Sequence, residues 1–455
     1  MRNLLRCRRG SVAFATVVAL VPLIGVVALG AEAGSWYVTK QHAQNAADAA
    51  AYSGALAVAC SLGAASCSDA QSMTYRAKEF AAQNGFCNAG DTTAYPGGQC
   101  ATSLPSGTSQ TVQIASLASW NGVNGNFVQA TVSQQQPAHL ATVLGLTTVD
   151  IGATAVAQVV KLANPCILSL HDPLSFQGSP TVQSPNCGLA SNSTATNSIS
   201  FTGNNGINVS NVGSMSAQGG CSQTGGTECS QVITFSPPVP NPLSGLDTAI
   251  ASLTPTDFPD GACPPPSTTS PISLPPYGVP KKCYYDGFSF QNNKTYNLNG
   301  VYFFADGPIT IQGNTKITGT ATLILLPPGF VKTSDPGASL KITGTPTIQL
   351  TAETSVSTTQ VPAKLASAVN LLSDLLIYDP ETTAKGVNIT GNAASFFNGI
   401  TYVPNSDVTF QGSTQTFNCV EVIAKGVTLS GNTNLDNSGC PASSTPTSQY
   451  VRMVQ

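Results

Sequence analysis

The side chains best able to do chemistry in this sequence are 13 cysteines, 3 histidines and 21 aspartates and glutamates. Metal ligation is disfavoured, because no Cys-x-x-Cys occurs and only His42, His139 and His171 could complete a ligand set. The sequence also lacks a Gly-x-Ser-x-Gly motif, a phosphate-binding loop and a His-Glu-x-x-His motif. We therefore predict no catalytic residues, no cofactor and no metal site.

The one acid–base dipeptide, His171-Asp172, is interpreted as a loop salt bridge or a solvated pair rather than a catalytic dyad. His139 is expected on the surface of a short helix. The later acids are scattered, with no Asp-Asp pair: Asp306, Asp335, Glu353, Asp374, Asp379, Glu381, Asp407, Glu421 and Asp436. A β-helix enzyme acting on acidic polysaccharides needs clustered carboxylates and a basic residue, yet no arginine occurs between Arg76 and Arg452. That enzyme is the least favoured hypothesis.

The cysteines indicate an oxidising compartment. Cys7 precedes a long apolar run, and the other twelve follow it. An even number on one side of a membrane is typical of an exported, disulfide-bonded chain. In sequence order they form six pairs, although other connectivities remain open: 60–67, 87–100, 166–187, 221–229, 263–283 and 419–440.

The apolar run that divides the cysteines, Ser11–Ala31, contains no charged residue. A helix of this length spans a hydrocarbon core of about 30 Å. Arginines crowd its N-terminal flank, whereas Glu32, Trp36 and Tyr37 follow it. The positive-inside rule places the N-terminus in the cytoplasm and the bulk of the chain outside. A cleavable signal peptide remains the alternative, with small-x-small sites at 28–30 and 31–33.

Charged residues make up only 9% of the sequence, against about 25% in ordinary globular chains. Gly, Pro, Ser, Thr and Asn take their place, which favours an exported β-rich protein with many turns. The net charge is −3, and beyond the N-terminal arginines no basic patch is visible. Nucleic acid is therefore not expected as a partner.

The N-terminal segment resembles TadG-like proteins (TadE/TadG family) of the Flp, or tight-adherence, pilus-assembly machinery. The residues that carry the resemblance are Arg9-Gly10-Ser11, the apolar span, Glu32, Trp36-Tyr37 and above all the block QNAADAAA at 44–51. The resemblance implies a bacterial envelope protein related to minor pilins. Prepilin processing uses a glutamate five residues into the mature chain, where this sequence has Ala15. The resemblance, with Ala15 at this position, therefore implies a retained membrane anchor.

Residues 1–60 are expected to form the basic flank, the transmembrane helix and an Ala-rich extension that needs a partner surface. Residues 61–163 are expected to form a small α+β stalk domain. A helix near 69–83 should precede strands near 111–116, 127–133 and 147–160, with a short helix near 136–145. This order is again similar to TadE/TadG-like proteins.

From Pro165 onward, the pattern apolar-x-Gly followed by a small polar residue recurs seven times. Its glycines are Gly178, Gly203, Gly313, Gly344, Gly391, Gly412 and Gly431. A unit of about 20 residues with inward apolar and outward polar side chains is typical of a right-handed parallel β-helix, expected over 164–445. Residues 446–455 are interpreted as a tail.

Two insertions interrupt the predicted β-helix. The segment 236–280 is rich in proline and is expected to be an extended surface excursion pinned by Cys263 and Cys283. The segment 361–374 contains a helical stretch, which would either lie on the solenoid or bind a partner. Cys166–Cys187 and Cys419–Cys440 are expected to staple the first and last coils, where a solenoid frays most easily.

Three hypotheses follow. The first is a non-enzymatic Tad/Flp pilus-assembly component, held in the bacterial inner membrane by Ser11–Ala31, with other Tad subunits as partners. The second is a surface adhesin that binds glycan or a host surface through the β-helix. The third is the polysaccharide-active enzyme.

Overall fold

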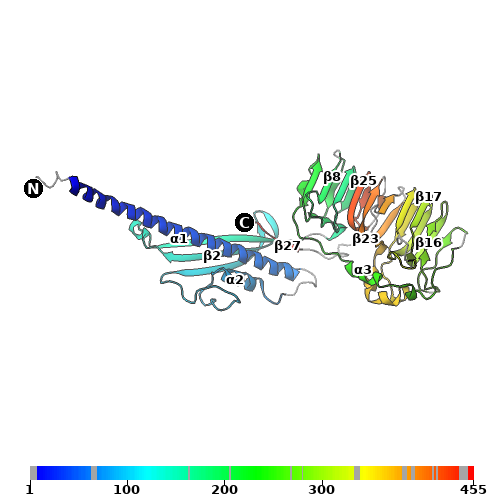
Figure 1. Ribbon diagram of the computed structural model, residues 1–455, viewed down its shortest axis with the longest axis horizontal. Helices are drawn as coiled ribbons and strands as arrows, with labels where there is room; N and C mark the ends of the chain where they lie inside the picture. Colours follow the sequence, from blue (N-terminus) through cyan, green and yellow to red (C-terminus); the bar gives the residue numbers. More distant parts are fainter. Residues whose placement is uncertain are drawn as a thin grey trace, which may run out of the picture. The chain divides into compact units, whose positions relative to one another are not determined.

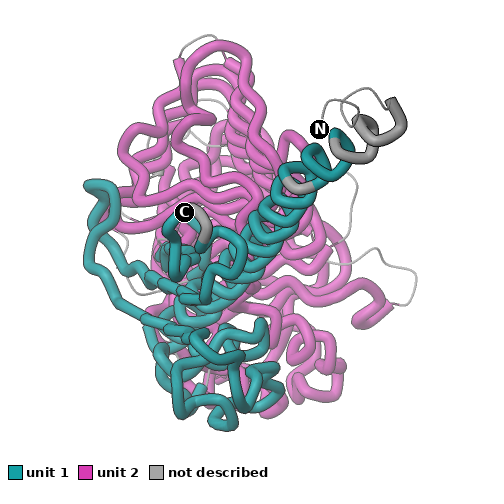
Figure 2. Tube along the Cα trace, turned by 90° about the vertical axis from the view of Figure 1, so that its left-hand side faces the viewer, with its two compact units in different colours: residues 1–161, 449–455 teal, residues 162–448 magenta. Residues whose placement is uncertain are grey.

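The computed structural model describes residues 8–62, 69–161, 164–203, 206–266, 269–278, 280–332, 339–381, 387–390, 395–411, 415–416, 419–439 and 449–455. Several predictions concern residues outside these ranges: Arg2, Arg6, Cys7, Cys67, Cys440, Gly391 and Gly412. The chain divides into two compact units (Figure 2). The first comprises Met1–Lys161 with Gln449–Gln455, and the second comprises Leu162–Ser448.

The first unit combines a long helix with an antiparallel sheet. Helix α1 (Arg8–Leu62) runs for 55 residues, includes Pro22, and lies along the sheet (Figure 1). The other elements are α2 (Met73–Gln83), β1 (Ser109–Trp120), β2 (Val123–Pro137), the 3-10 helix η2 (Ala141–Leu144), β3 (Thr148–Lys161) and β27 (Gln449–Met453). The sheet order is β1-β2-β3-β27.

The last strand corrects one prediction. Residues 446–455 were expected to be a tail, but Gln449–Met453 pairs antiparallel with Ala157–Lys161 of β3. Val451 joins the same buried cluster as the alanines of α1. The C-terminus therefore completes the first unit, a long-range pairing that no local pattern indicates.

The second unit is mostly β and is built from parallel strand pairs in a solenoid-like arrangement. Its N-terminal strands are β4 (Pro165–Ser169), β5 (Leu174–Gly178), β6 (Thr181–Ser184), β7 (Gly188–Ser191), β8 (Ile199–Thr202), β9 (Asn208–Val212), β10 (Met215–Ala217), β11 (Cys221–Thr224) and β12 (Val232–Ile233).

The strands that follow the proline-rich segment are β13 (Ile272–Ser273), β14 (Tyr285–Asp286), β15 (Ser289–Phe290), β16 (Thr295–Ala305), β17 (Ile309–Gly313), β18 (Lys316–Leu325), β19 (Leu340–Gly344), β20 (Thr347–Thr351), β21 (Leu375–Tyr378), β22 (Val387–Thr390), β23 (Phe396–Gln411), β24 (Gln415–Thr416), β25 (Val420–Gly431) and β26 (Asn434–Asp436). We call one circuit of strands, such as β4–β6, a coil.

The coils do not stack in sequence order. Along the largest sheet the order is β12-β10-β7-β4-β25-β23-β20-β18-β16-β13. The last coil of the chain, β25 and β26, pairs with the first, β4 to β6. The chain thus begins the solenoid in the middle of the stack, winds to one end, crosses to the other end, and winds back to its starting point (Figure 1).

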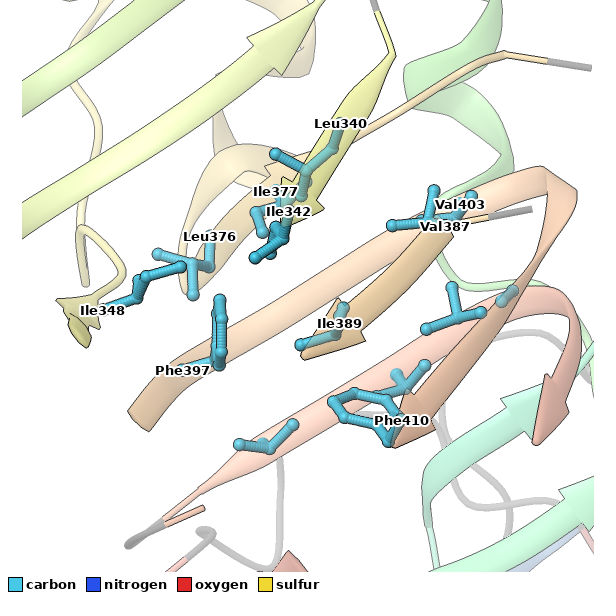
Figure 3. Packing of buried hydrophobic residues seen from close by; sticks show 14 of the residues in the cluster. Leu340, Ile342, Ile348, Leu376, Ile377, Val387, Ile389, Phe397, Val403 and Phe410 are labelled. Carbon is cyan, nitrogen blue, oxygen red and sulfur yellow. The ribbon is translucent and has the colours of Figure 1, made fainter. Parts of the chain in front are cut away.

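The seven sequence repeats supply one interior column. Phe410 lies opposite Leu429, Leu429 opposite Phe176, and Phe176 opposite Phe201. The rings of Phe176 and Phe201 stack with centroids 4.9 Å apart. Ile311 pairs with Ile342, and Ile389 pairs with Phe410. Figure 3 shows Ile342, Ile389 and Phe410 among the buried side chains of this interior.

The repeat glycines stack for a steric reason. Gly178 has φ +86°, and a Cβ built on it would lie 3.1 Å from the carbonyl oxygen of Gly431. A Cβ on Gly203 would lie 2.2 Å from the carbonyl oxygen of Gly178. Only glycine allows both the positive φ and this close approach between coils.

The proline-rich segment 236–280 was expected to be an extended surface excursion, but the structure shows that it also packs on the solenoid. It contains α3 (Ser244–Ala251) and β13, and it connects the β12 end of the stack to the β13 end. Leu246, Ile250 and Phe258 are buried in a second apolar cluster against the outer face of the large sheet. Because the crossover must pass the whole stack, it covers that face.

The predicted helical stretch at 361–374 is the 3-10 helix η6 (Ala363–Leu372). It contacts α3, and Leu365 and Leu372 are buried in the same second cluster. It therefore contributes to the layer that covers the large sheet.

Four of the predicted disulfides are present: Cys87–Cys100, Cys166–Cys187, Cys221–Cys229 and Cys263–Cys283. Cys60 and Cys419 are also disulfide-bonded, and the predicted pairs 60–67 and 419–440 include residues that lie outside the described ranges. The expectation that Cys166–Cys187 protects a fraying end is wrong. Its coils lie in the middle of the stack, next to β25.

Candidate functional sites: the anchor, the stalk and the solenoid junction

Helix α1 has two parts with opposite surroundings. The side chains described between Ala15 and Val27 are all exposed, including Val18, Leu23 and Val27. By length and composition this helix is able to cross a membrane. Further along, Ala43, Ala47 and Ala50 are completely buried. One continuous helix therefore supplies both an exposed apolar segment and part of the buried core of the first unit.

The QNAADAAA block forms the buried face of the helix. Its small side chains pack against the sheet in a cluster with Val128, Ala130, Ala155 and Ala157. Short side chains on both surfaces permit close contact between helix and sheet. On the flank of the helix, the amide of Gln44 donates to the Asp48 carboxylate at 2.8 Å. The extension was expected to need a partner surface, and the chain's own sheet is that surface.

Glu32 connects the apolar segment of α1 to the loop between β2 and β3. Its carboxylate accepts the backbone N–H groups of His139, Leu140 and Ala141 at 2.6, 3.0 and 2.8 Å. These groups begin the turn that leads into η2, where backbone N–H groups lack helical partners and favour an anion. The loop between β2 and β3 is thereby attached to α1 one residue after the apolar span.

A charged cluster lies where the last coil meets the first. The Asp172 carboxylate contacts Nδ1 of His171 at 2.8 Å and Nζ of Lys425 at 2.9 Å. Burial alone would raise the pKa of Asp172, but the hydrogen bonds from His171 and Lys425 outweigh it and hold the pKa below its usual value. Burial and the adjacent Asp172 raise the pKa of Asp407.

Backbone bonds reinforce this junction. The N–H groups of His171 and Asp172 both donate to the carbonyl of Lys425, at 2.9 and 2.7 Å. Asp407 pairs in register with Gly426 on the next strand. The cluster thus spans three neighbouring coils. The His171 side chain is 78% exposed.

A second pair of acids is buried. Asp379 is fully buried and accepts the N–H groups of Leu340 and Glu381 at 3.2 and 3.0 Å. Burial, together with the nearby Glu381, raises the pKa of Asp379 to about 6. Burial also raises the pKa of the Glu381 carboxyl. These acids fasten the β21–β22 turn to the start of β19.

Two recesses flank the segment that follows β20. One, of about 380 Å³, is lined by Asp374, Asn398 and Glu421. The other, of about 400 Å³, is lined by Asn299, Glu353 and Gln360. Burial raises the pKa of Glu353 and of Asp374. No group of three or more potential metal ligands gathers within the described ranges.

Sequence reasoning missed two of these arrangements. The junction brings Asp172 and Asp407 together although the sequence contains no Asp-Asp pair, because the two residues come from coils at opposite ends of the repeat region. Glu32 was noted only as a flank of the span. The available signal in the sequence was that Glu32 is a single charged residue directly after a long apolar run. His139 has an exposed side chain, as expected, but its backbone N–H binds Glu32.

Comparison with known protein families identifies two matches, both in the N-terminal third. Residues 10–59 match the family described as putative Flp pilus-assembly TadE/G-like. Residues 53–157 match the family described as putative Tad-like Flp pilus-assembly. The resemblance inferred from the anchor and the QNAADAAA block is confirmed over this region. No curated protein and no solved structure matches the chain.

Proposed function

We propose that this protein is a non-enzymatic component of a Tad/Flp-type pilus-assembly system, held in the bacterial inner membrane by Ser11–Ala31. Its N-terminus faces the cytoplasm. Residues 61–163 form a stalk domain, and residues 164–445 form a disulfide-stapled, right-handed parallel β-helix displayed in the periplasm or beyond. Other Tad subunits are its partners.

One observation carries this proposal: α1 continues without interruption from an exposed apolar segment into the buried core of the stalk. The two family matches cover this combined element and the sheet beneath it. Glu32 ties the sheet to the helix next to the span, so force on the stalk is transmitted to the membrane segment. Such a connection suits a structural role.

Three observations support the β-helix part of the proposal. The strand pairs of the solenoid are parallel, the repeats place apolar residues in one interior column, and disulfides occur in the portion outside the span. Disulfides persist in the periplasm and not in the cytoplasm.

Cell fractionation with accessibility labelling tests the proposal. The full-length chain is expected in the inner membrane, and protease added to spheroplasts should degrade the solenoid while leaving a short N-terminal fragment. A matched chain with Leu23→Arg and Ile24→Arg should lose membrane retention, because each charge at the centre of a span costs about 2.5–3.5 kcal/mol. Recovery of the wild-type chain as a soluble periplasmic protein would contradict the retained anchor.

A surface adhesin is the second candidate. It is supported by an exposed solenoid face whose outward residues are almost all uncharged Ser, Thr, Asn and Gln. Fractionation separates the two candidates, since an adhesin must reach the cell surface. Recovery of the protein only in the inner membrane would exclude the adhesin.

A further inference from the structure

The repeats create an outward surface as well as an interior column. In each apolar-x-Gly motif the apolar residue points inward, so the residues on either side of it point outward. Parallel pairing then aligns these outward residues from coil to coil. We call the resulting surface the polar ladder. One column holds Gln177, Thr202, Gln312, Thr343, Gln411 and Ser430, and the other holds Ser175, Thr310, Lys341, Asn388, Thr409 and Thr428, while the corresponding Ser200 is buried.

The strand registers establish the alignment. Ser430 lies opposite Gln177, and Gln177 lies opposite Thr202. In the other half of the stack Gln312 lies opposite Thr343, and β19 contacts β22. Neighbouring rungs are about 4.8 Å apart. Within each set of paired strands, neighbouring coils therefore present chemically similar groups at a constant interval.

The ladder is open to solvent. Gln177, Thr202, Gln312, Thr343 and Asn388 are exposed. The α3 and η6 layer packs on another face of the solenoid, against Leu168 of β4, Phe303 of β16 and Ile324 of β18. The aromatic residues of the motif, such as Phe176 and Phe201, lie inside the solenoid. The ladder consequently has polar groups without exposed aromatic anchors.

Several hydroxyl groups on the ladder side are held in a fixed orientation. Thr202 Oγ1 donates to the carbonyl of Phe176 at 3.2 Å, and Ser430 Oγ donates to that of Phe410 at 3.3 Å. On the adjoining coil, Thr224 Oγ1 donates to the carbonyl of Phe201 at 3.4 Å. A hydroxyl that donates to the neighbouring coil still has oxygen lone pairs that can accept a hydrogen bond from a ligand. These groups are thus ordered before any ligand arrives, which lowers the entropy lost on binding.

The chemistry of the ladder restricts its ligand. Lys341 is the only charged residue in the two columns, so neither a polyanion nor a polycation has groups to pair with. A protein partner would need buried aromatic or arginine anchors, which these columns lack. A hydroxyl-rich ligand that repeats regularly and carries no charge fits both the hydrogen-bonding groups and the periodic spacing.

We propose that the polar ladder is a docking surface for a neutral polysaccharide whose extended chains repeat along the solenoid axis, of the cellulose or chitin type. The inference specifies a ligand for the adhesin candidate and is independent of the pilus-assembly role. A binding assay on purified protein can fail while the fractionation result stands, so the two proposals are separately testable.

The chain provides a matched pair of substitutions. Gln177 and Gln183 belong to the same coil and are both exposed, but Gln177 lies on the ladder and Gln183 lies on β6 of another sheet. Gln177→Lys places a charge and a longer side chain on the ladder. Gln183→Lys makes the same chemical change beside it. Gln312→Lys extends the test to the other half of the stack.

The assay measures retention of the full-length protein, in detergent, on insoluble cellulose and chitin, with soluble alginate as a charged probe. Wild type and Gln183→Lys should bind the neutral polymers equally, while Gln177→Lys with Gln312→Lys should bind roughly tenfold more weakly. Circular dichroism melting confirms that all variants are folded.

Three outcomes would overturn the proposal: no retention on either neutral polymer, equal loss in Gln183→Lys, or preference for alginate. Growing ice also presents a flat lattice of hydroxyl groups, so thermal hysteresis is measured in parallel. Thermal hysteresis without retention on the polymers would show that the ladder binds ice and would reject a polysaccharide as its ligand.

Discussion

Gly178, in the first coil of the solenoid, lies directly opposite Gly431, in the last. The two residues come from the two ends of the repeat region, yet their strands are neighbours in the middle of the stack. The chain therefore enters and leaves the solenoid at adjoining coils. The predictions below begin with this contact.

Replacing Gly178 by alanine should destabilise the second unit by roughly 1–3 kcal/mol. The new Cβ would have φ +86° and would lie 3.1 to 3.3 Å from backbone atoms of Gly431. Gly261→Ala is the control, since Gly261 also has a positive φ but no atom within 4 Å of its Cβ position. Denaturant unfolding measures both variants. A loss no greater than that of Gly261→Ala would show that the close approach is unimportant.

Glu32→Ala should free the loop between β2 and β3. The Glu32 carboxylate accepts three backbone N–H groups of this loop, and all three hydrogen bonds are lost in the variant. Hydrogen exchange at the amides of His139, Leu140 and Ala141 is expected to accelerate strongly. Asp48→Ala on the same helix removes only a contact to Gln44 and should leave these amides protected. Unchanged exchange in the Glu32 variant would refute this attachment.

Ala47→Leu should lower the stability of the first unit by about 1–3 kcal/mol, because a fully buried position between helix and sheet cannot accept a larger side chain. Ala33→Leu is the matched control on the exposed surface of α1. Thermal melting of the full chain in detergent compares them. If both variants have the melting temperature of wild type, close packing of the QNAADAAA block against the sheet does not stabilise the first unit.

Asp379 predicts a pH dependence of stability. Its pKa is raised to about 6 in the folded chain from 3.8, so between those values the folded state holds a proton that the unfolded state releases. The contribution of Asp379 to the free energy of unfolding should therefore fall by about 3 kcal/mol as pH rises from about 4 to about 6.

Asp379→Asn should flatten this part of the pH profile, whereas Asp150→Asn, at an exposed site in the first unit, should not. Urea titrations at fixed pH steps provide the measurement. Identical pH profiles of wild type and Asp379→Asn between pH 4 and pH 6 would show that the pKa of Asp379 is not raised in the folded chain.

Local patterns in the sequence determined much of this protein. The apolar run at 11–31, the alanines of QNAADAAA and the seven apolar-x-Gly motifs each express a short-range period, and the structure uses them as a helix, a helix face and an interior column. The sequence-order pairs Cys166–Cys187 and Cys263–Cys283 also formed, since each closes a short loop.

Only the tertiary structure decided the order of the coils. Each coil carries the same inward and outward pattern, so any coil can stack on any other, and nothing local specifies that β25 pairs with β4. Because of that pairing, Cys166–Cys187 lies in the middle of the stack instead of at the expected end, and Asp172 lies beside Asp407. The same pairing also made the proline-rich segment a crossover that covers one face of the solenoid. Glu32 gained its partners in the same way, because its three amide donors are supplied by a distant loop.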